Sequence, residues 1–251
     1  MRYAPRDAVD LDALRAPAGA DNGVFFPILE SILVADRVRH VSFTRITFEH
    51  ATWREPSGTI GYVPQQSGAV NKAGYNGNND VYAYSAAAIT VLSSRDVSFD
   101  KCTFTRMGSG AALHVQRGSQ KVSISGCLFA DLSGSAVRLG DLDDWAEPNA
   151  ARQSAELSLT DSVVRDVANE YTDHCAVFLG YVRHSTVAHN RISDAPYTAI
   201  SLGWGWGREV SYAAENDIEG NHIERAVRCC RVAARALPSS SAQAAVASHG
   251  R

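Results

Sequence analysis

The chain has 251 residues, of which 20% are charged, and a formal net charge of −3. This balance gives no basic surface for nucleic acid or an anionic membrane, and no apolar run approaches the roughly 20 residues that span a bilayer. The five cysteines follow neither a metal-binding spacing nor a disulfide framework. The N-terminus has no apolar core region and is not predicted to be a signal peptide.

The first 40 residues are predicted to form an irregular segment or a cap. Residues 1–23 contain no repeat, whereas residues 24–34 are apolar enough for a capping strand or a short helix. The regular part of the chain is therefore expected to begin at residue 41.

From residue 41 onward one short sequence pattern keeps returning. Residues 97–104 read VSFDKCTF and residues 122–129 read VSISGCLF, and related copies occupy 41–48, 157–164 and 185–192, with a last copy ending at Ile223. Apolar and polar residues alternate inside each copy, which is the period of a half-buried β-strand. A second short strand is predicted after most copies, at 111–115, 136–139, 176–179 and 199–202.

A unit made of short strands and glycine turns cannot bury its own apolar side, but it can do so when stacked on its neighbours. The repeat therefore predicts an all-β parallel solenoid of about six coils over residues 41–227. The alternative is a sandwich or barrel of antiparallel strands. The alignment of the copies argues against it, because Cys102 and Cys127 share one position and a recurring Asp lies two residues past the end of three copies, at Asp131, Asp166 and Asp194.

Residues 228–251 are rich in Ala, Ser and Arg and show no alternation, so we expect a disordered tail. A solenoid end normally needs a cap, because an open end exposes unpaired strand edges. The missing cap predicts that the chain is incomplete or that its reading frame shifts near Ala226.

One segment carries a family resemblance. Residues 190–207 place Trp204 and Trp206 among three glycines directly after a predicted strand, and segments 50–53, 61–66, 139–144 and 180–183 support the same match. Here the chain resembles right-handed parallel β-helix carbohydrate-active proteins of the pectate-lyase-like superfamily, above all bacterial β-helical glycoside hydrolases of fucosidase and xylanase type. The resemblance implies a right-handed parallel β-helix, a polysaccharide or oligosaccharide partner and a secreted protein.

The chain also departs from that pattern. Relatives continue with an acidic Gly-Asp-Gly-Gly-type segment where this chain has residues 227–231, VRCCR. If one catalytic carboxylate normally comes from that segment, this chain lacks it.

Three insertions, at 54–84, 141–153 and 169–174, are predicted to border a groove for a glycan. Glycoside hydrolysis needs two carboxyl groups, one protonated and one ionised. Asp141 and Asp144 lie together in the second insertion, where mutual repulsion would raise the pKa of one of them; a solvated acidic loop is the alternative. Such a loop could instead hold Ca²⁺, but no set of six oxygen ligands is evident, so we expect no cofactor.

Two further carboxylates are candidates for the catalytic acid or base. Asp173 stands beside His174 in the third insertion, and Asp194 precedes the Trp segment. The recurrence of Asp at the position of Asp194 favours a structural role in a turn for this residue.

Aromatic residues are predicted to bind sugar rings. Exposed indoles at Trp204 and Trp206 would offer a flat apolar face and an N–H donor; the alternative is that one of them packs over the edge of a coil. Tyr181 and Tyr197 lie in neighbouring turns and extend the predicted surface.

The sequence thus favours a carbohydrate-active β-helix with glycoside hydrolase ancestry, acting as a monomer on a polysaccharide. The proposed acid and base come from the four aspartates named above, with His174 among the substrate-binding residues. A non-catalytic glycan-binding remnant and a polysaccharide lyase are the alternatives.

Overall fold

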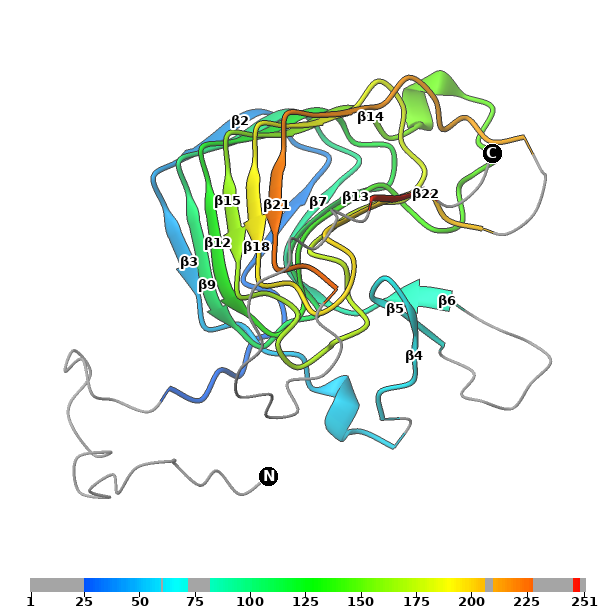
Figure 1. Ribbon diagram of the computed structural model, residues 1–251. Helices are drawn as coiled ribbons and strands as arrows, with labels where there is room; N and C mark the ends of the chain where they lie inside the picture. The colour runs from blue at the N-terminus through cyan, green and yellow to red at the C-terminus, as the bar shows by residue number, and fades with distance from the viewer. Residues whose placement is uncertain (1–24, 60, 72–81, 206–209, 228–245, 249–251) are drawn as a thin grey trace, which may run out of the picture.

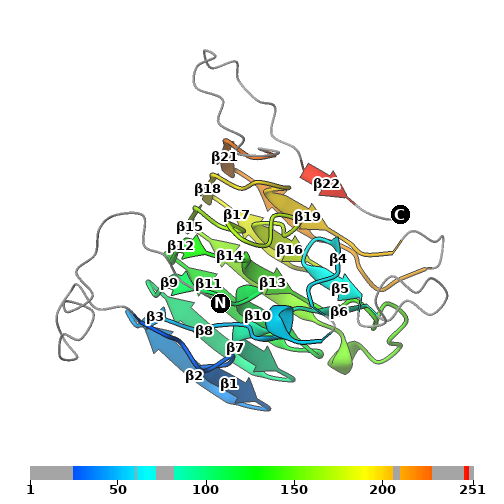
Figure 2. The same ribbon diagram turned by 90° about the horizontal axis from the view of Figure 1, so that it is seen from below.

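Three parallel sheets wrap around one core in the computed structural model, which describes residues 25–59, 61–71, 82–205, 210–227 and 246–248 (Figure 1). Each coil contributes one strand to each sheet. Strands from successive coils lie beside one another, as the progression from blue to orange in Figures 1 and 2 shows. The protein is therefore a parallel β-helix, and the predicted fold class is confirmed.

The strands belong to the following sheets. Sheet A contains β1 (Leu33–Asp36), β7 (Ala87–Leu92), β10 (Ala111–Gln116), β13 (Ser135–Leu139), β16 (Val177–Leu179), β19 (Ile200–Leu202) and β22 (Val246–Ser248). Sheet B contains β2 (Arg39–Thr44), β8 (Arg95–Asp100), β11 (Gln120–Ser125), β14 (Ala155–Thr160), β17 (Thr186–Ala188) and β20 (Asp217–Glu219). Sheet C contains β3 (Thr47–Glu49), β9 (Thr103–Met107), β12 (Leu128–Leu132), β15 (Val163–Arg165), β18 (Arg191–Ser193) and β21 (His222–Glu224).

The core is built from columns of like residues in successive coils. Phe104 pairs with Phe129 in the strand register, and their rings stack with centroids 4.5 Å apart. Cys102 and Cys127 occupy one interior column as free, buried thiols, as the repeat predicts. This in-register burial is what a single repeat could not achieve alone.

A buried amide ladder supports the turn between sheets B and C. The Asn190 side-chain amide donates to Asn221 Oδ1 at 2.9 Å and to the Leu159 carbonyl at 2.9 Å, and its own oxygen accepts the Ser162 N–H. These bonds satisfy backbone groups that the turn would otherwise leave unpaired.

The pairing of strands begins earlier than the boundary expected at residue 41, because β1 at Leu33–Asp36 pairs with β7. Within the predicted C-terminal tail, β22 pairs with β19. The other residues of the tail, and residues 1–24, lie outside the described part of the chain. Among the described residues, no helix has the length and apolar character to cross a membrane.

The first insertion forms a small antiparallel sheet of its own. It contains the 3-10 turn η2 (Glu55–Ser57) and the strands β4 (Pro64–Gln66), β5 (Ala69–Asn71) and β6 (Tyr82–Tyr84), and a second 3-10 turn, η3 (Ala150–Arg152), lies in the second insertion. This small sheet stands outside the coil stack, next to sheet A (Figure 1). Tyr84 of β6 packs edge-on against His114 and Phe178, which belong to the outer face of sheet A.

Candidate functional site

A groove of about 800 Å³ lies on the outer face of sheet A, along its first strands β1, β7 and β10. Thr90 of β7 and His114 of β10 line it and are neighbours in the strand register. Tyr84 of β6 and Asp141, at the start of the second insertion, also line it. The groove therefore brings together two insertions that are more than 50 residues apart in the sequence.

The carboxyl group of Asp141 is the most perturbed acid of this groove. The residue is 8% exposed, and this burial raises the pKa of Asp141 to about 7, while the Arg117 N–H, which donates to Oδ2 at 2.6 Å, lowers it. The nearby Asp144 and Asp143 raise it further. A carboxyl group with this pKa can be protonated near neutral pH and can give its proton to a leaving group.

The backbone around Asp141 is held from several sides. Gly140, directly before it, has φ +82°, and a Cβ at this position would come within 2.5 Å of the Tyr181 carbonyl oxygen. The Tyr181 N–H donates to the Asp141 carbonyl at 3.0 Å. Only glycine fits such a close approach in the left-handed region, so the residue before Asp141 is part of what positions it.

His114 supports the same segment from the floor of the groove. Its Nε2 lies 3.1 Å from the Gly140 carbonyl oxygen and can only be the donor to this acceptor. Burial, followed by the charge of Arg138, lowers the pKa of His114 to about 3. The imidazole is therefore neutral, and its Nδ1 is a hydrogen-bond acceptor.

Asp144, in the same insertion, contacts a tyrosine. The Tyr212 hydroxyl lies 2.7 Å from Asp144 Oδ2 and 2.7 Å from the Tyr181 carbonyl oxygen. Its single hydrogen can serve only one of these two acceptors, so a protonated Asp144 that donates to Tyr212 would satisfy both. Burial raises the pKa of Asp144 to about 6, and the contact with Tyr212 lowers it in part.

Beneath Tyr84 lies a guanidinium group that is entirely buried. Arg138, next to His114 in the strand register, donates to the Ser85 carbonyl at 2.8 Å and to the Gly110 carbonyl at 2.6 Å. Its Cζ lies 5.1 Å from the centre of the Tyr84 ring, within the range of a cation–π contact. Burial lowers the pKa of Arg138 to about 10, which still leaves it charged at neutral pH.

The predicted Asp173–His174 pair lies next to Arg138. His174 is fully buried, with Nδ1 2.9 Å from the Gly110 carbonyl oxygen and 3.2 Å from Arg138 Nη2. Asp173 accepts a hydrogen bond from Tyr62 of the first insertion, and burial raises its pKa. Burial and the charge of Arg138 hold the pKa of His174 well below its usual value, so this ring is neutral. A fully buried His174 cannot touch a glycan in this conformation.

The aromatic residues are less exposed than expected. Trp204 is 9% exposed and packs edge-on against Phe178 and Tyr82, so the expectation of an exposed indole is wrong for this residue. The physical reason is that the glycine-rich turn folds back onto the small insertion sheet, where the indole buries more apolar area. Tyr181 is also buried and donates its hydroxyl hydrogen to the Trp204 carbonyl at 2.5 Å.

The two remaining aromatic candidates are Tyr197 and Trp206. Tyr197 is half-buried, and its hydroxyl oxygen accepts a hydrogen bond from the side chain of Gln66 at 3.1 Å. Trp206 lies outside the described residues.

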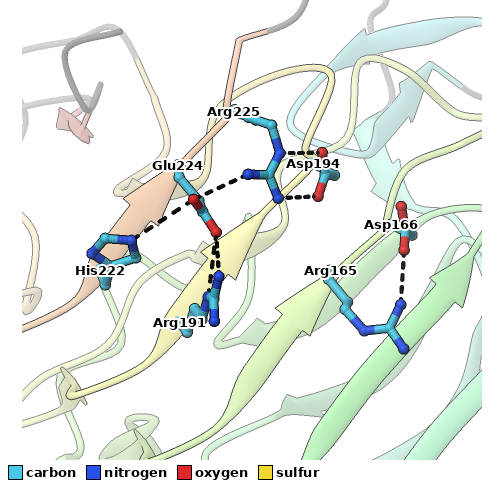
Figure 3. A network of polar contacts seen from close by, with 7 residues as sticks. All are labelled: Arg165, Asp166, Arg191, Asp194, His222, Glu224 and Arg225. Atoms are coloured by element: carbon cyan, nitrogen blue, oxygen red, sulfur yellow. Dashed lines mark hydrogen bonds and ion pairs between the residues drawn. The ribbon is translucent and has the colours of Figure 1, made fainter. Parts of the chain in front are cut away.

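Asp194 lies after β18 of sheet C, in a network of ion pairs (Figure 3). Its two oxygens accept from Arg225 at 2.7 and 2.8 Å. It has φ +56°, and the same left-handed backbone recurs at Asp131 and Asp166. Asp tolerates this conformation better than most residues, which gives the recurring aspartates a reason in backbone geometry. This carboxylate is not among the residues that line the groove.

Several polar residues around this groove were missed by sequence reasoning. His114 and Arg138 stand at ordinary strand positions in the repeat, where polar residues are expected to face solvent, and Tyr84 lies in the first insertion. The one sequence feature that could have indicated their burial is the long insertion at 54–84, which has to cover some part of the solenoid surface. Among the described residues, no three His, Cys, Asp or Glu side chains are grouped so as to hold a metal ion.

The protein is thus a parallel β-helix, and a groove lined in part by carboxyl groups lies on its sheet A. No family model and no curated protein matches the sequence. A solved structure described as a glycoside hydrolase matches the fold with a TM-score of 0.73 and 26% sequence identity, over 80% of this chain and 38% of that one. The chain therefore spans well under half the length of that neighbour. The match supports a carbohydrate-active function in general.

Proposed function

We propose that this protein is a β-helical glycoside hydrolase that binds a polysaccharide in the sheet A groove, with Asp141 as the general acid. The observation that carries the proposal is the nearly unexposed Asp141 carboxyl group in the groove, whose pKa is raised to about 7. A glycosidase acid must be protonated at working pH yet able to release its proton, which a pKa near neutrality allows.

The second carboxylate of the reaction comes, in this proposal, from the other acids that line the groove, which are Glu30, Asp36 and Asp143. The side chains of Asp36 and Asp143 are exposed, so a ligand in the groove can reach them, as a base or nucleophile requires. Asp144, Asp173 and His174 then act as supports of the loops around the groove, and Asp194 as a turn residue.

The finer assignment rests on the sequence. The Trp-Gly-Trp segment at 204–206 and the coil repeats support membership of the pectate-lyase-like superfamily and a fucosidase or xylanase type of activity. An extracellular location and a monomeric state belong to the same proposal.

The test is to incubate the protein with a panel of polysaccharides and to measure new reducing ends and ultraviolet absorbance together. Hydrolysis gives reducing ends alone, whereas a lyase also gives unsaturated, absorbing ends. The Asp141→Asn variant should lose about 100-fold or more in rate, the range of general acid catalysis. The matched control is Asp161→Asn, an exposed aspartate on the turn between β14 and β15.

Three results would count against the proposal. Absorbing ends would favour the lyase alternative. Binding without any product would favour a non-catalytic glycan-binding module. Full activity of Asp141→Asn would remove Asp141 from the reaction and leave the acid to be found elsewhere.

A further inference from the structure

The sheet A groove runs along the whole length of a strand. Its lining includes Ala87, Thr90 and Leu92, which stand at the first, fourth and last positions of β7. A strand of six residues spans about 20 Å. Asp141 accepts the N–H of Arg117, the residue after β10, so its carboxyl group lies at the end of the groove where these strands finish. The groove therefore follows the strands, across the axis of the coil stack.

A second cavity of about 570 Å³ lies at the other end of the groove, where β7 begins. Glu30, Tyr84 and Ala86 line both cavities. Both cavities are open to solvent, so an extended chain can pass from one to the other over this shared wall. We call the sheet A groove the near compartment and the second cavity the far compartment.

The far compartment holds one exposed donor on a fixed segment. The Arg54 N–H donates to Glu30 Oε1 at 2.7 Å, and the indole of Trp53 packs edge-on against Tyr62 and Tyr171. These contacts hold the backbone in place. The side chain of Arg54 is 72% exposed, and its Nε lies 3.9 Å from Glu30, which is a weak ion pair. Its guanidinium can therefore donate to sugar hydroxyls.

An aromatic wall lies between the two ends. Tyr82 and Tyr84 stand two residues apart on β6, so their rings lie on the same face of that strand, about 7 Å apart. Both residues line the near compartment and are half-buried, and they pack edge-on against Trp204 and His114, respectively. Part of each tyrosine remains open to the groove, where it offers an apolar surface to a sugar ring.

We infer that the protein binds a stretch of several sugar units laid along the strands of sheet A, from Asp141 to Arg54, and that the first insertion selects for chain length. A short oligosaccharide fills one compartment only. A longer one also contacts Tyr84 and the far compartment, and gains binding energy remote from the reacting bond. The inference rests on the proposed function, because it concerns the ligand of the same groove.

The experiment is a titration of the wild-type chain with xylo-, manno- and galacto-oligosaccharides, from the dimer to the octamer, followed by calorimetry. In at least one series we expect the hexamer to bind about tenfold more tightly than the trimer, which corresponds to 1.4 kcal/mol. The same mixtures are assayed for cleavage products, so that binding and hydrolysis are measured separately.

Two variants locate the source of this length dependence. Arg54→Ala removes the guanidinium but keeps the N–H that bonds to Glu30. Ala86→Gln places a larger side chain on the wall between the compartments. Each should bring the ratio of hexamer to trimer affinity close to one. The control is Arg39→Ala, an exposed arginine on β2 that lines neither compartment and should keep the tenfold ratio. Thermal unfolding confirms that each variant is folded.

The outcomes separate this inference from the proposed function. Equal wild-type affinities for trimer and hexamer would overturn the inference. A tenfold ratio that persists in both folded variants would overturn it as well, because chain length would then be sensed elsewhere. A ratio that both variants abolish, without any cleavage, would support the inference and overturn only the hydrolytic part of the proposed function. If no oligosaccharide is bound, both fail.

Discussion

Charged residues occupy two very different settings in this molecule. On sheet C, Asp194 and Arg225 form a two-bond ion pair with side chains 22% and 46% exposed (Figure 3). On the outer face of sheet A, Arg138 is fully buried and has no carboxylate within ion-pair distance among the described residues. Asp141 lies in the neighbouring loop with a pKa raised to about 7.

The difference shows where chemistry is to be sought. Exposed ion pairs contribute little to stability, and each member already satisfies the other. A buried charge without a counter-charge destabilises the folded state, and titratable groups in such surroundings are typical of functional sites. The ion pairs on sheet C therefore belong to the turns of the coils, whereas the charged groups on sheet A surround a groove.

The largest effect on stability is expected at Asp141. A carboxyl group that titrates near pH 7 in the folded protein but near 4 when unfolded holds an extra proton between these pH values. Stability therefore falls as the pH rises from about 4 to 7, and the loss is complete above 7. Asp141→Asn removes this loss and should stabilise the protein at pH 8 by on the order of 4 kcal/mol.

Urea denaturation at several pH values would measure this change. The gain of Asp141→Asn over the wild type should be near zero at pH 4 and should grow up to pH 7, while Asp161→Asn should show no such trend. A gain that is the same at pH 4 and pH 8 would contradict the raised pKa of Asp141.

Arg138→Met should be the next largest change, and in the opposite direction. It removes the donors to Ser85 and Gly110 while roughly keeping the side-chain volume. Buried acceptors left without partners should lower the free energy of unfolding by about 3 kcal/mol. The pKa of His174 should rise, because the nearby charge that lowers it is gone, and NMR titration would detect this.

The comparison for that variant is Arg225→Met on sheet C. This change should cost less than about 1 kcal/mol, because its ion pair is exposed. Equal losses of unfolding free energy in the two variants would mean that the buried Arg138 contributes no more to stability than the exposed Arg225.

A buried polar residue outside the groove provides an intermediate case. Asn190→Ala leaves the Ser162 N–H and the Leu159 carbonyl without their partner in the turn between sheets B and C. We expect a loss of about 2 kcal/mol in unfolding free energy, measured by urea denaturation. Asn149→Ala is the control, since its side chain also accepts one backbone hydrogen bond but is exposed. A similar small loss in both variants would argue against a structural role for the amide ladder.

The fold could be predicted from the sequence because its determinants are repeated. Cys102 and Cys127, or Phe104 and Phe129, reveal their common column through their common place in the repeat, and stacking in register is the one arrangement that buries all of them. Asp141 could also be proposed, because it opens an insertion directly after a strand of the repeat.

The burial of the site could not be predicted in this way. His114 and Arg138 occupy outward positions of their strands, and they are buried because Tyr84, from a distant insertion, and the adjacent Ser85 cover them. Trp204 likewise depends on contacts with Tyr82 and Phe178. Such contacts arise from one particular loop packing and leave no periodic trace in the sequence.

The smallest expected effect is the coupling between Asp194 and Arg225. In a double-mutant cycle with Asp194→Ala and Arg225→Ala, the coupling free energy should be about 0.2–1 kcal/mol at low salt. It should shrink in 1 M NaCl, where charges this exposed are screened. Asp194 and Arg225 both adopt a left-handed backbone conformation, with φ +56° and +52°. Asp tolerates this conformation better than Ala does, so Asp194→Ala alone should lose somewhat more stability than Arg225→Ala. A coupling above 2 kcal/mol that resists salt would place this pair in the same class as the buried charges of sheet A, and the contrast between the two regions would no longer hold.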